Sequence, residues 1–285
     1  MTSGLDCGPT RRGRFLFTKV PEITLCFWIV KLLTTAMGEA ASDALVYHIN
    51  PYLAVGLGAL GFVVALIVQF WTKRYNAYAY WLLVVMVSIF GTMVADVIHI
   101  VLGVPYALSA AGFALALAVV FVAWYVSEKT LSIHSIYTTR REVFYWAAVL
   151  ATFALGTATG DLTAMTLHLG YFASGLLFAI LFLLPGVGYW WFDLNPIFAF
   201  WASYIVTRPL GASFADWFSK PPSLDGLGYG DALVSLILTV FIVILVVYLA
   251  VTKIDIKREP EQADPIESAA ARVPAVILAT KNEVP

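Results

Sequence analysis

Charged side chains are scarce in this sequence. Asp, Glu, Lys and Arg make up 12% of its 285 residues, whereas hydrophobic residues make up 61% and the mean hydropathy is +0.85. A soluble domain of this size carries about twice that charged fraction. The composition therefore excludes a water-soluble globular domain, and we expect a lipid bilayer rather than a nucleic acid as the main partner.

Cysteine is almost absent as well. The chain has Cys7 and Cys26 only, which excludes a disulfide framework and a cysteine-based metal cluster. It also lacks a nucleophile triad, a P-loop and a metalloprotease helix, so we predict no enzyme.

Long apolar segments dominate what remains. A helix needs about 20 apolar residues to cross a bilayer, and the backbone must satisfy its own hydrogen bonds there. The sequence thus predicts an all-α polytopic membrane protein with eight spanning helices, at residues 22–46, 51–71, 78–102, 106–126, 142–168, 171–191, 197–218 and 230–251.

Basic residues predict the orientation. All but one of the Lys and Arg residues outside the spans fall on one side, while Lys220 alone is on the other. By the positive-inside rule, both termini then lie in the cytoplasm, as in a bacterial inner-membrane protein. We predict a flexible basic cytoplasmic arm (1–20), two halves (21–126 and 142–252), a cytoplasmic loop between them (127–141) and a disordered cytoplasmic tail (253–285).

One spacing, Trp-x9-Gly-x4-Asp, occurs four times. Its members are Trp28, Gly38 and Asp43; Trp81, Gly91 and Asp96; Trp146, Gly156 and Asp161; and Trp201, Gly211 and Asp216. Each copy opens a helical hairpin, and all hairpins share one orientation. This predicts parallel repeats with pseudo-symmetry about the membrane normal. We expect the first helices to line the axis, the second helices to face lipid, and the tryptophans to form an interfacial belt.

Polar residues form a stripe on each first helix. Residues four apart share a helix face, so Asp43, Glu39, Thr35 and Lys31 lie together, as do Asp96, Thr92 and Ser88. The corresponding stripes carry Asp161 with Thr157, and Asp216 with Arg208. The glycines (Gly38, Gly91, Gly156 and Gly211) belong to small-xxx-small pairs that permit close helix packing.

Carboxylates inside a bilayer are costly and are functional by default. We predict a cation or proton site formed by Asp43, Asp96, Asp161 and Asp216, with Glu39, Thr35, Thr92 and Thr157 as further ligands. Oxygen ligands favour Mg²⁺, Ca²⁺ or Mn²⁺, and a nitrogen from His48, His99 or His168 would favour Mn²⁺ or Zn²⁺. Interfacial positions are the simpler reading of the histidines. Lys31 and Arg208 are expected to compensate charge by reaching acids on neighbouring helices.

The run GLGYGD, Gly226 to Asp231, is similar to a potassium-channel filter and to the Gly-x-Gly-Asp of intramembrane aspartyl proteases. The repeat explains it more simply, because Tyr229 is the fourth tyrosine that opens a second helix.

Four stretches carry a family resemblance: VPEITLCFWIVKLLTTAMGEAASD, SEKTLSIHSIYTTRREVFYW, FALGTATGD and YIVTRPLGASFADW. With these, the chain resembles a widespread bacterial group of integral, "membrane-anchored" proteins, over residues 20–250. The resemblance implies no established activity.

The residues themselves favour a small secondary transporter or exporter of an inorganic cation, with a divalent metal as the preferred ion and proton coupling at the acids. A membrane scaffold or sensor with structural buried acids is the main alternative, and an intramembrane aspartyl protease is a minor one.

Overall fold

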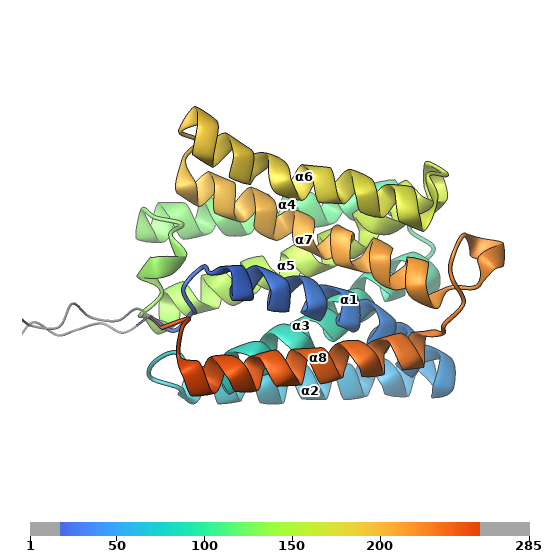
Figure 1. Ribbon diagram of the computed structural model, residues 1–285, viewed down its shortest axis with the longest axis horizontal. Helices are drawn as coiled ribbons and strands as arrows, with labels where there is room; N and C mark the ends of the chain where they lie inside the picture. The colour runs from blue at the N-terminus through green and yellow to red at the C-terminus, as the bar shows by residue number, and fades with distance from the viewer. Residues whose placement is uncertain (1–17, 257–285) are drawn as a thin grey trace, which may run out of the picture. The chain divides into compact units, whose positions relative to one another are not determined.

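The computed structural model describes residues 18–256, and residues 18–255 belong to one compact unit. Its eight α-helices lie side by side (Figure 1). They are α1 (Leu25–His48), α2 (Pro51–Trp71), α3 (Ala77–Asp96), α4 (Tyr106–Glu128), α5 (Thr139–Asp161), α6 (Gly170–Phe192), α7 (Pro196–Ser219) and α8 (Asp231–Thr252). Short helical turns follow α3 (η1, Val97–Val101), α4 (η2, Ile133–Ser135), α5 (η3, Leu162–Thr166) and α7 (η4, Pro222–Leu224).

Polar caps define where several of these helices begin. The Thr24 side chain accepts a hydrogen bond from the Phe27 amide at the start of α1, and Thr138 caps α5 in the same way. Asn50, Asn76 and Asn195 cap α2, α3 and α7. Each cap satisfies an amide that the first helical turn leaves unpaired.

Seven of the eight helices in the described residues are long and apolar enough to cross a membrane. The exception is α7, which carries Arg208 and Asp216. The helices therefore support a multi-pass membrane protein, while the helix at the predicted span 197–218, α7, is not apolar enough to meet this measure.

The first helices of the hairpins form a closed ring. Helix α1 packs against α3 and α7, and α5 packs against the same two helices. The second helices surround this ring, but each covers the first helix of the next hairpin: α2 packs on α3, α4 on α5, α6 on α7, and α8 on α1. This cyclic arrangement matches the predicted parallel repeats.

The repeat glycines set the ring spacing. A Cβ built on Gly91 would lie 2.8 Å from Phe153 Cβ, and one on Gly211 would lie 2.8 Å from Thr35 Cβ. Gly38 meets Ser88 and Gly156 meets Arg208 in the same manner. Each glycine thus packs against the residue eight positions before the Asp of the next repeat, and the last repeat closes onto the first.

Burial differs between the two sets of helices. In the most apolar window of α1, α3 and α5, 56–61% of the residues are buried, compared with 17–22% in α2, α4, α6 and α8. The exposed surface of the second helices is apolar, as the lipid-facing prediction requires.

The predicted tryptophan belt is wrong for three of the four repeat tryptophans. Trp81, Trp146 and Trp201 are no more than 5% exposed, and they pack with Tyr80, Tyr145 and Tyr204. We call these six residues the aromatic layer. They pack inside the bundle because they lie on the ring-facing side of their helices.

Candidate cation site

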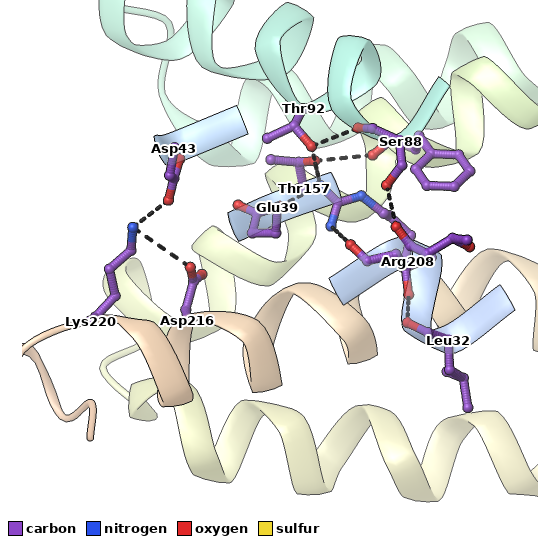
Figure 2. A network of polar contacts seen from close by, with 12 residues as sticks. Leu32, Glu39, Asp43, Ser88, Thr92, Thr157, Arg208, Asp216 and Lys220 are labelled. Carbon is purple, nitrogen blue, oxygen red and sulfur yellow. Dashed lines mark hydrogen bonds and ion pairs between the residues drawn. The ribbon is translucent and has the colours of Figure 1, made fainter. Parts of the chain in front are cut away.

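Arg208 of α7 lies at the centre of the ring (Figure 2). Its Nη2 donates to Glu39 Oε2 on α1, to Thr92 Oγ1 on α3 and to Thr157 Oγ1 on α5. We call these four residues the arginine cluster. Glu39, Thr92 and Thr157 each precede their repeat Asp by four positions. One guanidinium therefore joins all four repeats at the same level, and the prediction that Arg208 reaches an acid on another helix is confirmed.

Two of the three predicted threonine ligands, Thr92 and Thr157, have hydroxyls that each donate one hydrogen bond and accept one from Arg208. Thr92 Oγ1 donates to the Ser88 carbonyl at 2.9 Å, and Thr157 Oγ1 donates to the Phe153 carbonyl at 3.1 Å. Their lone pairs therefore face Arg208. Thr35 Oγ1 donates to the Leu32 carbonyl at 2.7 Å, and its own carbonyl oxygen lies 3.5 Å from Arg208 Nη1. Such oxygens are arranged to accept from a cation, and that cation is Arg208 here.

The prediction that Lys31 reaches an acid is wrong. Its Nζ lies over two rings, 3.9 Å from the centroid of Phe153 and 4.3 Å from that of Tyr204. Within residues 18–256 it has no hydrogen-bond partner, and the residue is 1% exposed. The ammonium is therefore held by cation–π attraction to these two rings.

Two of the four predicted aspartates come together. Oxygen atoms of Glu39, Asp43 and Asp216 all lie within 4.8 Å of one another, and we call these three residues the carboxylate group. Asp216 is 5% exposed, and its Oδ1 has no hydrogen-bond partner in the described part of the chain. This buried oxygen therefore accepts no hydrogen bond within the described range, and the Lys220 ammonium lies 3.9 Å from it.

Lys220, just after α7, neutralises this end of the site. Its Nζ contacts Asp43 Oδ2, lies 3.2 Å from Asp231 Oδ1 and lies 3.9 Å from Asp216 Oδ1. Figure 2 shows the ammonium between Asp43 and Asp216. Burial opposes the charged form, but the neighbouring carboxylates outweigh it and raise the pKa of Lys220 above its ordinary value.

Lys220 is a site residue that the repeat pattern does not single out, because it lies outside the four Trp-x9-Gly-x4-Asp segments. Two signals were available: it follows Asp216 by four positions, and it is the one basic residue on its predicted side of the membrane. Because Lys220 is the one basic residue on the side where the repeat aspartates lie, these acids are its expected charge partners. The membrane topology therefore predicts that Lys220 belongs to the site.

The GLGYGD run holds Lys220 in place. The amides of Leu227, Gly228, Tyr229 and Gly230 donate to the carbonyls of Trp217, Lys220, Phe218 and Ser219. A Cβ on Gly226 would overlap the Lys220 carbonyl. Gly228 and Gly230 have φ values of 81° and 84°, which favour glycine. The run thus caps the last turn of α7.

Asp96 and Asp161 differ from the other two repeat aspartates. Neither takes part in an ion pair or in the carboxylate group among the described residues. Each is the last α-helical residue before a π-helical segment, η1 or η3. Such segments often occur at functional sites. These two carboxylates are only partly buried.

The histidines stand apart from these acids. His48 and His168 are exposed, and His99 stacks on Tyr106 with its Nδ1 at 2.7 Å from the Val104 carbonyl. Within residues 18–256, none joins the carboxylate group. The site therefore offers oxygen ligands only.

The four-fold repetition of this geometry agrees with a family comparison. The model of the family described as Repeat of Unknown Function (DUF347) matches residues 26–75, 79–130, 144–194 and 199–255. The chain belongs to this family. As a DUF347 protein, it has one matched segment for each hairpin, and each ring helix contributes to the arginine cluster. No curated protein matches the chain. No solved structure matches it either.

Proposed function

We propose that this DUF347 protein is a small secondary transporter of an inorganic cation, with a divalent metal as the preferred substrate and proton exchange at the acids. In this proposal α7 also spans the membrane, which makes eight spans in all, and both termini face the cytoplasm of a bacterial inner membrane. The observation that carries it is the carboxylate group of Glu39, Asp43 and Asp216, in which the buried Asp216 Oδ1 accepts no hydrogen bond from the described residues and has only the Lys220 ammonium, 3.9 Å away, as a charge partner.

The ligand chemistry supports a hard cation. The three carboxylates offer oxygen atoms within 4.8 Å of one another, and hard divalent cations prefer such ligands. Asp96 and Asp161 provide two further acids on the neighbouring ring helices. Acids outnumber the basic residues Lys31, Arg208 and Lys220 around the axis, so an added cation or bound protons would balance the charge.

Arg208 and Lys220 act as tethered cations in this mechanism. The Arg208 guanidinium binds the Glu39 carboxylate and the threonine hydroxyls at the ring centre, and the Lys220 ammonium binds the Asp43 carboxylate. A substrate cation would displace one or both of them. Because the ring helices touch through glycines, moving Arg208 would require α5 and α7 to shift together. Replacement of Arg208 by a substrate cation would in this way couple cation binding to the positions of α5 and α7.

The two ends of the ring differ in a way that fits alternating access. The carboxylate group lies toward the Lys220 end, where Asp43 and Asp161 are only partly buried. Toward the opposite end, the aromatic layer fills the ring, and the hydroxyls of Tyr80 and Tyr145 are 2.6 Å apart. We assign this arrangement to a state open toward the Lys220 end.

The alternative is a membrane scaffold or sensor, which one observation favours. Arg208 and Lys220 already neutralise Glu39 and Asp43, so the acids could serve to hold the helices together. Under this alternative, no cation would cross the membrane.

Flux into proteoliposomes separates the two functions. We expect the wild type to carry at least one of Mg²⁺, Ca²⁺, Mn²⁺ or Zn²⁺, and we expect Asp216→Asn and Asp161→Asn to abolish this flux while the proteins remain folded. Asp193→Asn is the matched control, because Asp193 is exposed at the end of α6. Unchanged flux in both site variants, or no wild-type flux for any cation, would refute the transporter.

A further inference from the structure

A short segment at the start of the described chain crosses the end of the ring opposite Lys220. We call residues 18–24 the strap. The Thr18 carbonyl accepts from the Tyr75 amide at 3.0 Å, and the Lys19 amide donates to the Ile136 carbonyl at 2.8 Å. The Glu22 amide donates to the Asp255 carbonyl at 2.9 Å. The strap therefore bonds to the segments that follow the first, second and fourth hairpins.

The third hairpin is tied to the strap by a buried ion pair. Lys19 Nζ lies 2.5 Å from Glu142 Oε2 in the first turn of α5. Gln69 at the end of α2 donates to Glu142 Oε1 at 3.0 Å. Lys19 is 6% exposed and Glu142 is fully buried. Glu142 precedes Thr157 of the arginine cluster by 15 residues on α5, which is about 22 Å along the helix axis, so the pair lies outside the proposed cation site.

The strap has an apolar contact beneath it. Val20 is 4% exposed and belongs to the same core as Ile136, Tyr80 and Trp146. Tyr75 joins the strap to this core, because its ring packs on Tyr80 at 5.8 Å and its hydroxyl donates to Asp255. The strap and the aromatic layer thus form successive barriers at one end of the ring.

We propose that the strap is a latch that holds this end of the ring closed, and that the Lys19–Glu142 ion pair is its lock. The strap bridges connections between hairpins that must separate if the ring is to open here. Among the described residues, the strap makes two contacts between ionisable groups, Lys19–Glu142 and Glu22–His134. The Glu22–His134 contact is 3.7 Å long and exposed to solvent, so the buried Lys19–Glu142 pair supplies most of the charge-dependent attachment. Removing one partner leaves the other charge buried and unpaired, which favours release of the strap. The latch rests on the proposed function only in that opening this end would complete alternating access.

Labelling of the strap tests the latch without any transport measurement. In detergent-solubilised full-length protein carrying Cys7→Ser and Cys26→Ser, Val20→Cys places a thiol under the strap. We expect slow reaction with a charged maleimide, and at least about tenfold faster reaction when Glu142→Gln is added. A tenfold change requires only about 1.4 kcal/mol, and breaking a buried ion pair exceeds this. Glu142→Gln keeps an oxygen for Gln69 and removes only the charge.

Glu128→Gln is the matched control. Glu128 pairs with Arg141 at 2.8 Å on the same end of the bundle, but it makes no ion pair with the strap. Equal labelling rates for Glu142→Gln, Glu128→Gln and their parent would overturn the latch. If Val20→Cys does not fold, hydrogen exchange of the Lys19 and Glu22 amides in Glu142→Gln gives the same test. Faster exchange is expected there, and unchanged exchange overturns the proposal.

Flux measurements keep the two proposals apart. Absence of wild-type cation flux would refute the transporter, whatever the labelling shows. Wild-type flux that is unaltered by Glu142→Gln, together with fast labelling, would show that the strap opens without gating transport, and would overturn its role as a latch.

Discussion

Gly156 of α5 and Arg208 of α7 are packed so closely that a Cβ on the glycine would lie 2.5 Å from the Arg208 Cβ. This contact brings the base of the arginine side chain against the α5 backbone. From there the guanidinium reaches Glu39, Thr92 and Thr157 on the other ring helices. The same type of contact recurs at every junction of the ring, so the repeat glycine determines where the polar residues meet.

Gly156→Ala should therefore destabilise the protein, by about 1–3 kcal/mol, because overpacking moves Arg208 or α5. Gly160→Ala is the control on the same helix, since its nearest neighbour would be Pro209 Cα at 3.8 Å. Alanine at that position should be neutral or stabilising by up to about 1 kcal/mol through helix propensity. Thermal unfolding in detergent measures both, and equal stability of the two variants would contradict the packing argument.

Arg208→Met should cost about 3–5 kcal/mol, because it leaves Glu39 buried without its partner. Glu39→Gln should also destabilise the protein, because the buried guanidinium then has only neutral oxygen acceptors and no carboxylate partner. The double variant should lose less than the sum of the single losses, since neither charge remains buried. A double-mutant cycle in detergent gives the coupling, and additive losses would show that the two residues act independently.

Lys220→Gln should destabilise by about 1–3 kcal/mol, between the values for exposed and buried ion pairs. Because the pKa of Lys220 is raised in the folded state, its contribution is fully present below about pH 10, the unfolded value. It is lost only as pH rises through the higher folded value. The difference between wild type and Lys220→Gln should thus stay constant from pH 7 to 9. Lys73→Gln, at an exposed position, is the control and should change little.

Asp255 should give the protein a separate pH dependence. Burial raises its pKa, although the Tyr75 hydroxyl donates to the carboxylate. A carboxyl with a raised folded pKa lowers stability as pH rises from its unfolded value, about 3.9, to the folded one. Comparing Asp255→Asn with wild type between pH 4 and 7 isolates this effect. The variant should gain stability relative to wild type as pH rises, and parallel curves would contradict the assignment.

Two predicted boundaries shift because of tertiary contacts. Lys19 was expected in a flexible arm of residues 1–20, and Asp255 in a disordered tail of residues 253–285, yet both are buried. The composition of the terminal segments does not predict that either residue is buried, because each is held by a partner far along the chain, Glu142 for Lys19 and Tyr75 for Asp255. Residues 1–17 and 257–285 lie outside the described range.

The repeat spacing by itself determined the hairpins, the polar stripe and which helices form the ring, because helical periodicity and the cost of intramembrane charge leave few alternatives. It also placed Arg208 within reach of an acid. Only the tertiary structure decided which acids meet. Asp43 and Asp216 lie with Glu39 because the Lys220 ammonium lies between their carboxylates, whereas Asp96 and Asp161 have no such cation among the described residues and are followed by π-helical segments. The Lys31 ammonium likewise lies over the rings of Phe153 and Tyr204 instead of next to an acid. Which side chains face a polar stripe depends on how the four helices pack in the ring, and the spacing of residues along the sequence does not encode that packing.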